Sequence, residues 1–216
     1  MTQLWNRYRS TSQQVGGGIP VWVEIPKDVV GGGMVLNNLR IDEVLASGTP
    51  VEYDYKTHNA KLLKCFKVES TAVSGTDTVI TLLKTARTPQ LYAGMNVMVA
   101  PATVTANGKA VTVTSVDEST EGVYKITVAT ADIDAVNNTK YLVEATSAGA
   151  AVKMYAIPNN FTKEDTVGGD QNTIGIPRGE KYLYENMIPA LPDSIKTYIV
   201  EKARVEFAWF PEEVQP

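Results

Sequence analysis

The stretch Ala110-Val111-Thr112-Val113-Thr114-Ser115-Val116 decides the fold class, because apolar and hydroxyl side chains alternate along it with a period of two. Such alternation is typical of a β-strand with one buried face. The same period recurs in Tyr124-Lys125-Ile126-Thr127-Val128. Valine and threonine are abundant around both segments, and their branched side chains suit a pleated sheet. The sequence therefore predicts a mainly β protein with many short strands.

Turn signals separate the predicted strands. Ser74-Gly75, Asn107-Gly108 and Glu121-Gly122 each lie between two alternating runs. Asn107-Gly108 is the strongest of these, because a two-residue type I′ turn needs positive φ at both central positions. We therefore expect a β-hairpin between Thr103 and Val116.

Helical periodicity is scarce and is concentrated near the C-terminus. Apolar residues at Ile195, Tyr198 and Ile199 follow Asp193, which we expect to cap a short helix over residues 192–200. An alternating final strand is predicted over residues 203–209.

The most Thr- and Val-rich part of the chain is the block from residue 69 to residue 155, where turn signals follow one another closely. This pattern favours a small β-sandwich or barrel. We predict that residues 69–155 form an inserted β domain. The short-stranded host β domain then consists of residues 34–68 together with residues 156–216, because insertions are tolerated where the chain ends of the host lie close together.

The first 33 residues differ from the rest of the chain. Glycine triplets at residues 16–18 and 31–33 bracket an apolar segment that contains Val21, Trp22 and Ile25. Glycine restricts the backbone little, so we expect a segment that is hinged at both ends. Two interpretations stay open: an extended N-terminal arm that lays a strand on a neighbouring subunit, or a first strand of the same domain.

Composition excludes several classes of site. The chain has 216 residues, a formal net charge of -4, one cysteine and one histidine. A disulfide framework within the chain, a multi-cysteine zinc site and a histidine-rich metal centre are excluded, and we predict no metal and no cofactor. The acidic balance argues against a general phosphate-binding surface, so we expect no nucleic-acid partner. No apolar stretch is long enough to span a membrane and none resembles a secretory signal, so we predict synthesis in a reducing cytoplasm.

Candidate catalytic groups are few. Glycosidases need two carboxylates at a suitable separation, and three pairs of acidic residues are candidates. All three pairs lie beside predicted turns or on exposed faces, so we favour the interpretation that they are solvated surface residues and not catalytic groups. His58 is predicted in a polar turn, and Cys65 is expected to fill the core as a small hydrophobic residue. Aromatic and basic residues are interleaved near the N-terminus, a pattern that is typical of sites that bind a nucleic-acid strand by stacking and charge pairing. Anchoring of this segment to another protein is the favoured interpretation. The acid pairs are Glu52 with Asp54, Asp117 with Glu118, and Glu164 with Asp165.

Several ordered segments resemble the head-fibre and capsid-decoration proteins of tailed bacteriophages, in particular those of Bacteroidetes phages. Ala46-Ser47-Gly48-Thr49-Pro50 is similar to a turn that enters a strand in that family. Pro158-Asn159-Asn160-Phe161-Thr162 resembles its "PNGLTxDD" segment. Arg178-Gly179 and the later Ile188-Pro189 are similar to its "RG…RIP" run. The segment Tyr141-Leu142-Val143-Glu144-Ala145 resembles the end of its inserted β domain.

The resemblance implies a protein without catalytic residues. One end of the chain is then expected to bind the major capsid protein, while the inserted domain projects from the head of the virion. We also expect a homo-oligomer, with a trimer favoured, since small β domains leave edges for neighbours to cover. Large aromatic residues dominate such contacts, so the predicted capsid or subunit contacts are Trp5, Arg7, Tyr8, Val21, Trp22 and Ile25.

Two alternatives to this interpretation stay open. The first is a tail or baseplate adhesin that binds a bacterial surface glycan, for which exposed aromatics such as Tyr92 and Tyr124 would be needed. The second is a carbohydrate-active enzyme that uses the Glu52 and Asp54 pair or the Asp117 and Glu118 pair.

Overall fold

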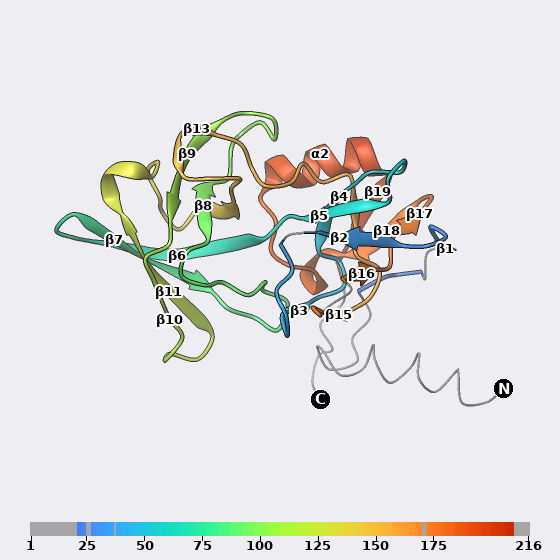
Figure 1. Cartoon of the computed structure of the whole chain (residues 1–216), viewed down its shortest axis with the longest axis horizontal. Coiled ribbons are helices and arrows are strands. Elements are labelled where there is room, and N and C mark those ends of the chain that lie inside the picture. The colour runs from blue at the N-terminus through green and yellow to red at the C-terminus, as the bar shows by residue number, and fades with distance from the viewer. Residues whose placement is uncertain (1–20, 25–26, 37, 170–171, 210–216) are drawn as a thin grey trace.

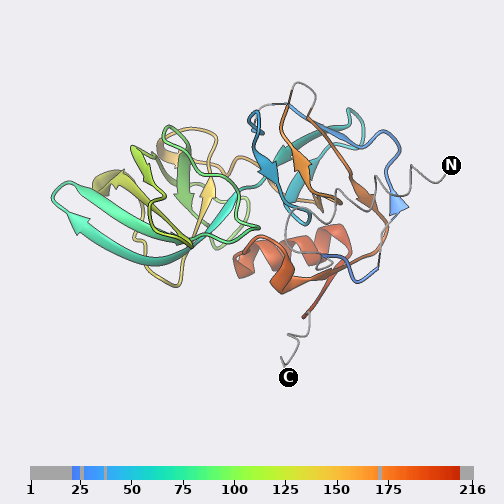
Figure 2. The same cartoon turned by 90° about the horizontal axis from the view of Figure 1, so that it is seen from below.

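Residues 21–24, 27–36, 38–169 and 172–209 are described here from a computed structural model. This part of the chain is mainly β and contains one α-helix, as the sequence predicts. The elements form two lobes that lie side by side in both views (Figure 1, Figure 2). We call residues 65–152 the half-barrel lobe, and the described residues on either side of that range the helix lobe.

One antiparallel sheet builds the half-barrel lobe, with the strand order β10-β11-β7-β6-β12-β8-β9-β13. The sheet curls, so that β9 approaches β11 although the two strands are not paired. Tyr124, Ile126 and Val128 are buried in the apolar cluster of this lobe, which confirms the predicted alternation. The strands are β6 (Cys65–Ser74), β7 (Asp77–Leu83), β8 (Asn96–Val99), β9 (Gly108–Thr112), β10 (Ser115–Asp117), β11 (Val123–Ala129), β12 (Tyr141–Glu144) and β13 (Gly149–Val152), and η1 (Thr130–Asp132) is a 3₁₀ turn.

The helix lobe contains shorter strands in several small sheets. A five-stranded sheet has the order β14-β4-β5-β2-β16, and three two-stranded sheets pair β1 with β17, β3 with β15 and β18 with β19. The pairs β2–β5 and β18–β19 are parallel. The elements are β1 (Lys27–Asp28), β2 (Gly33–Val35), β3 (Val44–Leu45), β4 (Pro50–Tyr53), β5 (Asn59–Leu62), β14 (Asn160–Phe161), β15 (Thr166–Val167), β16 (Thr173–Ile174), β17 (Pro177–Arg178), β18 (Lys181–Tyr184), η2 (Glu185–Met187), α2 (Asp193–Ala203) and β19 (Val205–Ala208).

The hairpin predicted between Thr103 and Val116 is wrong. Residues 103–107 form no strand, and β9 pairs instead with β8 and β13. Gly108 provides space rather than a turn, because a Cβ atom there would lie 2.6 Å from Cε of Met98. The segment before it is a loop that buries Val104 in the core, which the dipeptide signal could not reveal.

The helix lies where the periodicity predicts it, and Ile195 and Ile199 are buried. The predicted Asp193 cap is wrong, because Pro192 occupies the N-cap position and no side-chain cap forms. The Asp193 carboxylate lies instead 3.3 Å from Nζ of Lys196. The final strand begins only at Val205, since the preceding residues still belong to the helix and its C-cap.

The glycine triplet at residues 31–33 is not the hinge predicted from the sequence. Gly31 and Gly32 have φ angles of 87° and 62° and form a turn between β1 and β2. A Cβ atom on Gly33 would lie 3.1 Å from the ring of Tyr53, whose hydroxyl donates to the Gly32 carbonyl over 2.9 Å. The triplet is therefore a packed turn that needs glycine for close approach and for positive φ.

Residues 21–23 run along β18 of their own chain. The Val21 carbonyl accepts a hydrogen bond from the Tyr184 N–H, and the Val23 N–H donates to the Tyr182 carbonyl. Val21 is buried in the same apolar cluster as α2. For these residues the structure shows a strand-like segment of the same lobe, which is one of the two alternatives predicted for this part of the chain.

The two lobes share one apolar cluster. Cys65, Met98 and Val143 of the half-barrel lobe belong to the same buried cluster as Leu183 and Ile195 of the helix lobe. Burial of this surface on both sides fixes the position of one lobe against the other. The boundaries of an inserted domain at residues 69 and 155 stay a prediction, and the sheet of this lobe begins at β6 and ends at β13.

Gly48 offers a test of this packing. Its φ is +77°, and a Cβ atom would lie 2.4 Å from Cγ2 of Ile188. Gly48→Ala should therefore lower the free energy of unfolding by about 2–4 kcal/mol, the sum of backbone strain and overpacking. Gly122 is a matched control, since its φ is also +77° but a Cβ atom there would have nothing within 4 Å. Chemical denaturation of Gly48→Ala and Gly122→Ala measures the difference, and equal losses would contradict the packing argument.

Candidate interaction surface

The predicted contact residues divide into two groups. Trp5, Arg7, Tyr8 and Ile25 lie outside the described residues. Trp22 is half-buried on its own lobe, and its indole N–H donates to the Lys163 carbonyl over 2.8 Å and approaches Oγ of Ser47 at 3.2 Å. Together with the buried Val21, this side chain is engaged within the chain.

The Glu52 and Asp54 carboxylates both hold the local fold. Glu52 accepts a hydrogen bond from the Ile157 N–H over 2.8 Å and lies 3.4 Å from Nζ of Lys61. Asp54 accepts hydrogen bonds from the Lys56 N–H and the Thr57 hydroxyl in the turn between β4 and β5. These hydrogen bonds, the Lys56 N–H foremost, lower the pKa of Asp54. Asp54 therefore stabilises the turn between β4 and β5, and Glu52 connects β4 to the backbone at Ile157.

The two other acid pairs are also engaged. Asp117 accepts from the Ser119 N–H, and Glu118 forms an ion pair of 2.6 Å with Lys84. Asp165 accepts from the Ser47 N–H over 2.6 Å, and it lies 3.3 Å from Nη1 of Arg87 in the half-barrel lobe. The contact between Asp165 and Arg87 is an ion pair between the lobes, which proximity in the sequence could not indicate.

His58 and Cys65 lie where the sequence predicts them. His58 has a φ of 60° in the turn before β5, and Nδ1 of its ring lies 2.7 Å from the Tyr53 hydroxyl. Cys65 is buried at the start of β6, and burial raises the pKa of its thiol. A buried thiol of raised pKa is a poor nucleophile.

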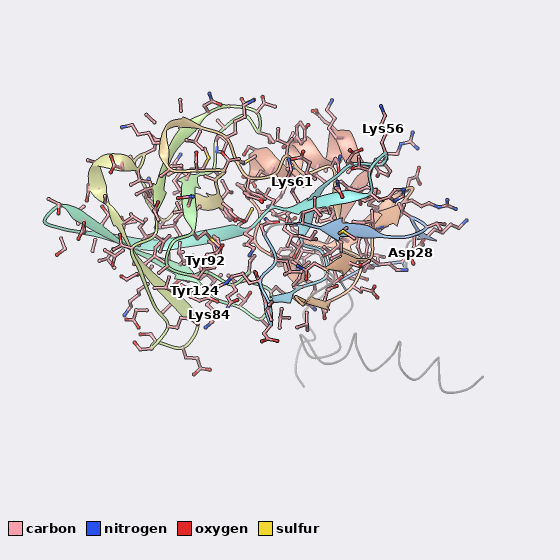
Figure 3. All side chains as sticks on the ribbon, viewed as in Figure 1. Asp28, Lys56, Lys61, Lys84, Tyr92 and Tyr124 are labelled. Atoms are coloured by element: carbon pink, nitrogen blue, oxygen red, sulfur yellow. The ribbon has the colours of Figure 1, made fainter. Side chains whose placement is uncertain are left out.

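Tyr92 and Tyr124 do not form an exposed aromatic surface. Tyr124 is 4% exposed, and Tyr92 is partly buried. The Arg40 guanidinium lies 4.3 Å from the centre of the Tyr92 ring, and Nζ of Lys84 lies 4.6 Å from that of Tyr124. Figure 3 labels both tyrosines and Lys84 on the half-barrel lobe. The stacking surface expected of a glycan-binding adhesin is therefore absent at these two residues.

A buried charged cluster lies at the junction of the lobes. Nζ of Lys64 contacts both carboxylate oxygens of Glu43 at 2.6 and 2.8 Å, with 0% and 1% of the two side chains exposed. Glu144, at the end of β12, accepts a hydrogen bond from Nδ2 of Asn38 over 3.1 Å. We call these four residues the junction cluster. The sequence places Lys64 within an apolar run, which was a signal for a buried charge, but nothing in the sequence identified its partner.

Burial controls the ionisation of Glu144. Desolvation raises the pKa of this carboxyl, while the Lys64 ammonium and the Asn38 hydrogen bond oppose the shift. Glu43 adds a second negative charge nearby and raises the pKa further. The junction cluster therefore holds two carboxyl groups and one ammonium group in a region that excludes water.

A groove of about 490 Å³ separates the two lobes next to α2. Lys67 and Arg87 line it from the half-barrel lobe, and Glu185, Lys196 and Trp209 line it from the helix lobe. Lys196 is paired with Glu185 at 2.5 Å, and Arg87 with Asp165. Both of these cations thus have carboxylate partners within the chain, so the groove carries less free positive charge than its lining indicates.

Exposed apolar side chains are distributed unevenly between the lobes. Among the described residues, Val73 is the one large apolar residue of the half-barrel lobe that is strongly exposed. All the others of this kind lie on the helix lobe. They are Val23, Val30, Met34, Leu36, Ile41, Val44, Tyr55, Val167, Val200 and Trp209.

Within the described ranges, no group of three or more His, Cys, Asp or Glu side chains is arranged to hold a metal ion. In the same residues, α2 does not meet the length and hydropathy that a membrane-crossing helix requires.

Comparison with known proteins gives no relative: no family model, no curated protein and no solved structure matches this chain.

The ion pair between Lys64 and Glu43 is open to a direct test. Lys64→Met leaves two buried carboxyl groups without their cation, so we expect the free energy of unfolding to fall by about 3–5 kcal/mol. Lys61→Met removes an exposed ion pair with Glu52 and should cost about 1 kcal/mol or less. Urea unfolding of both variants measures the contrast. A cost for Lys64→Met as small as that of the control would show that the ion pair does not hold the junction.

The pH dependence of stability should report on Glu144. Its pKa is raised in the folded state, so folding favours the protonated form, and this stabilisation is complete below the ordinary value of 4.5. It is lost as the pH rises from there through the raised pKa. Glu144→Gln keeps a hydrogen-bond acceptor for Asn38 but cannot ionise. We expect the stability of the wild type relative to this variant to fall with rising pH in that window, as measured by thermal unfolding; a constant difference would contradict the assignment.

Proposed function

We propose that this chain is a non-enzymatic structural protein of a bacteriophage particle, a head-fibre or capsid-decoration protein. The helix lobe binds the major capsid protein of the shell, and the half-barrel lobe projects from the capsid surface. Residues 69–155 act in this proposal as an inserted β-sandwich or barrel domain. The resemblance of the turn at residues 46–50 and of the segment at residues 158–162 to head-fibre proteins supports this assignment.

The observation that carries the proposal is the uneven distribution of exposed apolar side chains. A protein that docks by one end needs apolar surface there, and a polar surface where it faces water. The helix lobe has the first property and the half-barrel lobe the second, with Val73 as its exception. The shared core and the Arg87–Asp165 ion pair keep the two lobes in a fixed orientation, which suits a projecting component.

In this proposal, the extended arm consists of residues 1–20 and not of residues 1–33. The segment from Val21 onward packs on the helix lobe, and β1 and β2 are paired within the chain. Removal of residues 1–33, the boundary of the predicted arm, would therefore disrupt the fold itself. Trp5, Arg7 and Tyr8 stay the proposed contacts of the arm with the capsid or with another subunit, and copies of the chain associate on the shell, with the trimer as the proposed state.

Binding to isolated shells tests this function. Deletion of residues 1–20 removes the proposed arm and leaves every described residue in the chain. Circular dichroism checks that the variant folds, and the folded variant should lose most of its occupancy on the shell. Val73→Glu alters the exposed surface of the half-barrel lobe and should bind as the wild type does. Electron microscopy of decorated particles measures the occupancy. Unchanged occupancy after the deletion would refute the role of the arm, and absence of the protein from mature particles would refute the function.

A further inference from the structure

The turn at residues 40–43 presents an isoleucine to solvent at a position where turns normally carry polar residues. Ile41 is 71% exposed at its tip. The turn is closed by the Glu43 N–H, which donates to the Arg40 carbonyl, and Asp42 has a φ of 63°. An isoleucine so exposed contributes little to the core of its own chain, so packing within the fold does not explain it.

The same turn is held rigidly by the rest of the protein. The Glu43 carboxylate accepts from the Arg40 N–H over 3.0 Å and is bound to the buried Lys64. The Arg40 guanidinium lies over the Tyr92 ring. The Asp42 N–H donates to the Gly168 carbonyl over 2.9 Å. A group that is fixed in place before binding loses little conformational freedom on binding, which favours a role in recognition.

The two strands that follow the turn and pair beside it also carry exposed apolar side chains. Val44 of β3 and Val167 of β15 are paired across the ladder, so their side chains lie on one face of the two-stranded sheet. They are 43% and 58% exposed. The Gly168 N–H donates to the Glu43 carbonyl and joins this sheet to the turn. We call Ile41, Val44 and Val167 the ribbon face.

We propose that the ribbon face binds the same face of another copy of this chain. Arg40 and Asp42 flank Ile41 and are both exposed, so the rim of the face carries both signs of charge. In a symmetric contact, Arg40 of one copy meets Asp42 of the next while the apolar side chains pack together. A partner whose surface carried one sign of charge would leave Arg40 or Asp42 facing a like charge, which opposes binding. This inference deepens the self-association in the proposed function and does not require the shell.

Sedimentation velocity of the purified chain, over a range of concentrations, tests the contact. We expect the wild type to form a closed dimer, because a contact between two identical faces has two-fold symmetry. Ile41→Glu and Val167→Glu place charges in the apolar centre and should each raise the dissociation constant about tenfold or more. Both positions are exposed, so the far-ultraviolet circular dichroism spectrum should stay unchanged.

Val73→Glu is the matched control, because Val73 is 69% exposed but lies on the half-barrel lobe. It should associate as the wild type does. A wild type that stays monomeric at all concentrations would overturn the proposal, and so would equal weakening by the control or no weakening by Ile41→Glu. Binding to shells is measured in a separate experiment. A wild type that associates with itself but does not bind shells would count against the proposed function and not against this contact.

Discussion

The fold depends on an ion pair that is closed to water. Lys64 stands between β5 and β6, where the chain leaves the helix lobe, and its ammonium group is bound by both oxygens of Glu43. Transfer of two charges out of water is costly, and the attraction between them offsets that cost only when the geometry is kept. The pair therefore fixes the end of β5, the turn at residues 40–43 and the start of β6 at once.

This constraint explains why the two lobes behave as parts of one body. Asn38 connects the strand end at Leu62 to Glu144 by hydrogen bonds, so the junction cluster joins the end of β12 in the half-barrel lobe to the helix lobe. The shared apolar cluster and the ion pair between Arg87 and Asp165 add contacts on other sides of the junction. A turn anchored in this cluster can hold Ile41 in a defined position on the surface.

Three of the carboxylates that the sequence offers as catalytic candidates form hydrogen bonds within the fold. Glu52, Asp54 and Asp165 each accept backbone N–H groups that would otherwise lack a partner at a turn or a strand end. Among the described residues, every large exposed apolar side chain except Val73 lies on the helix lobe. These two properties favour a protein that works by contact with other proteins, and they are the physical basis of the proposed role on a particle surface.

The period-two alternation of apolar residues determined that this protein is mainly β, because strand periodicity depends on local geometry alone and one buried face suffices to enforce it. The same kind of local rule, applied to helical periodicity, predicted the position of α2. Such rules failed for Gly108, which begins β9 beside Met98 instead of forming a hairpin turn, and for the glycine triplet packed against Tyr53. Only the tertiary structure could pair Lys64 with Glu43, because residues distant in the sequence meet through the path of the whole chain, and a buried charge selects its partner by position in space.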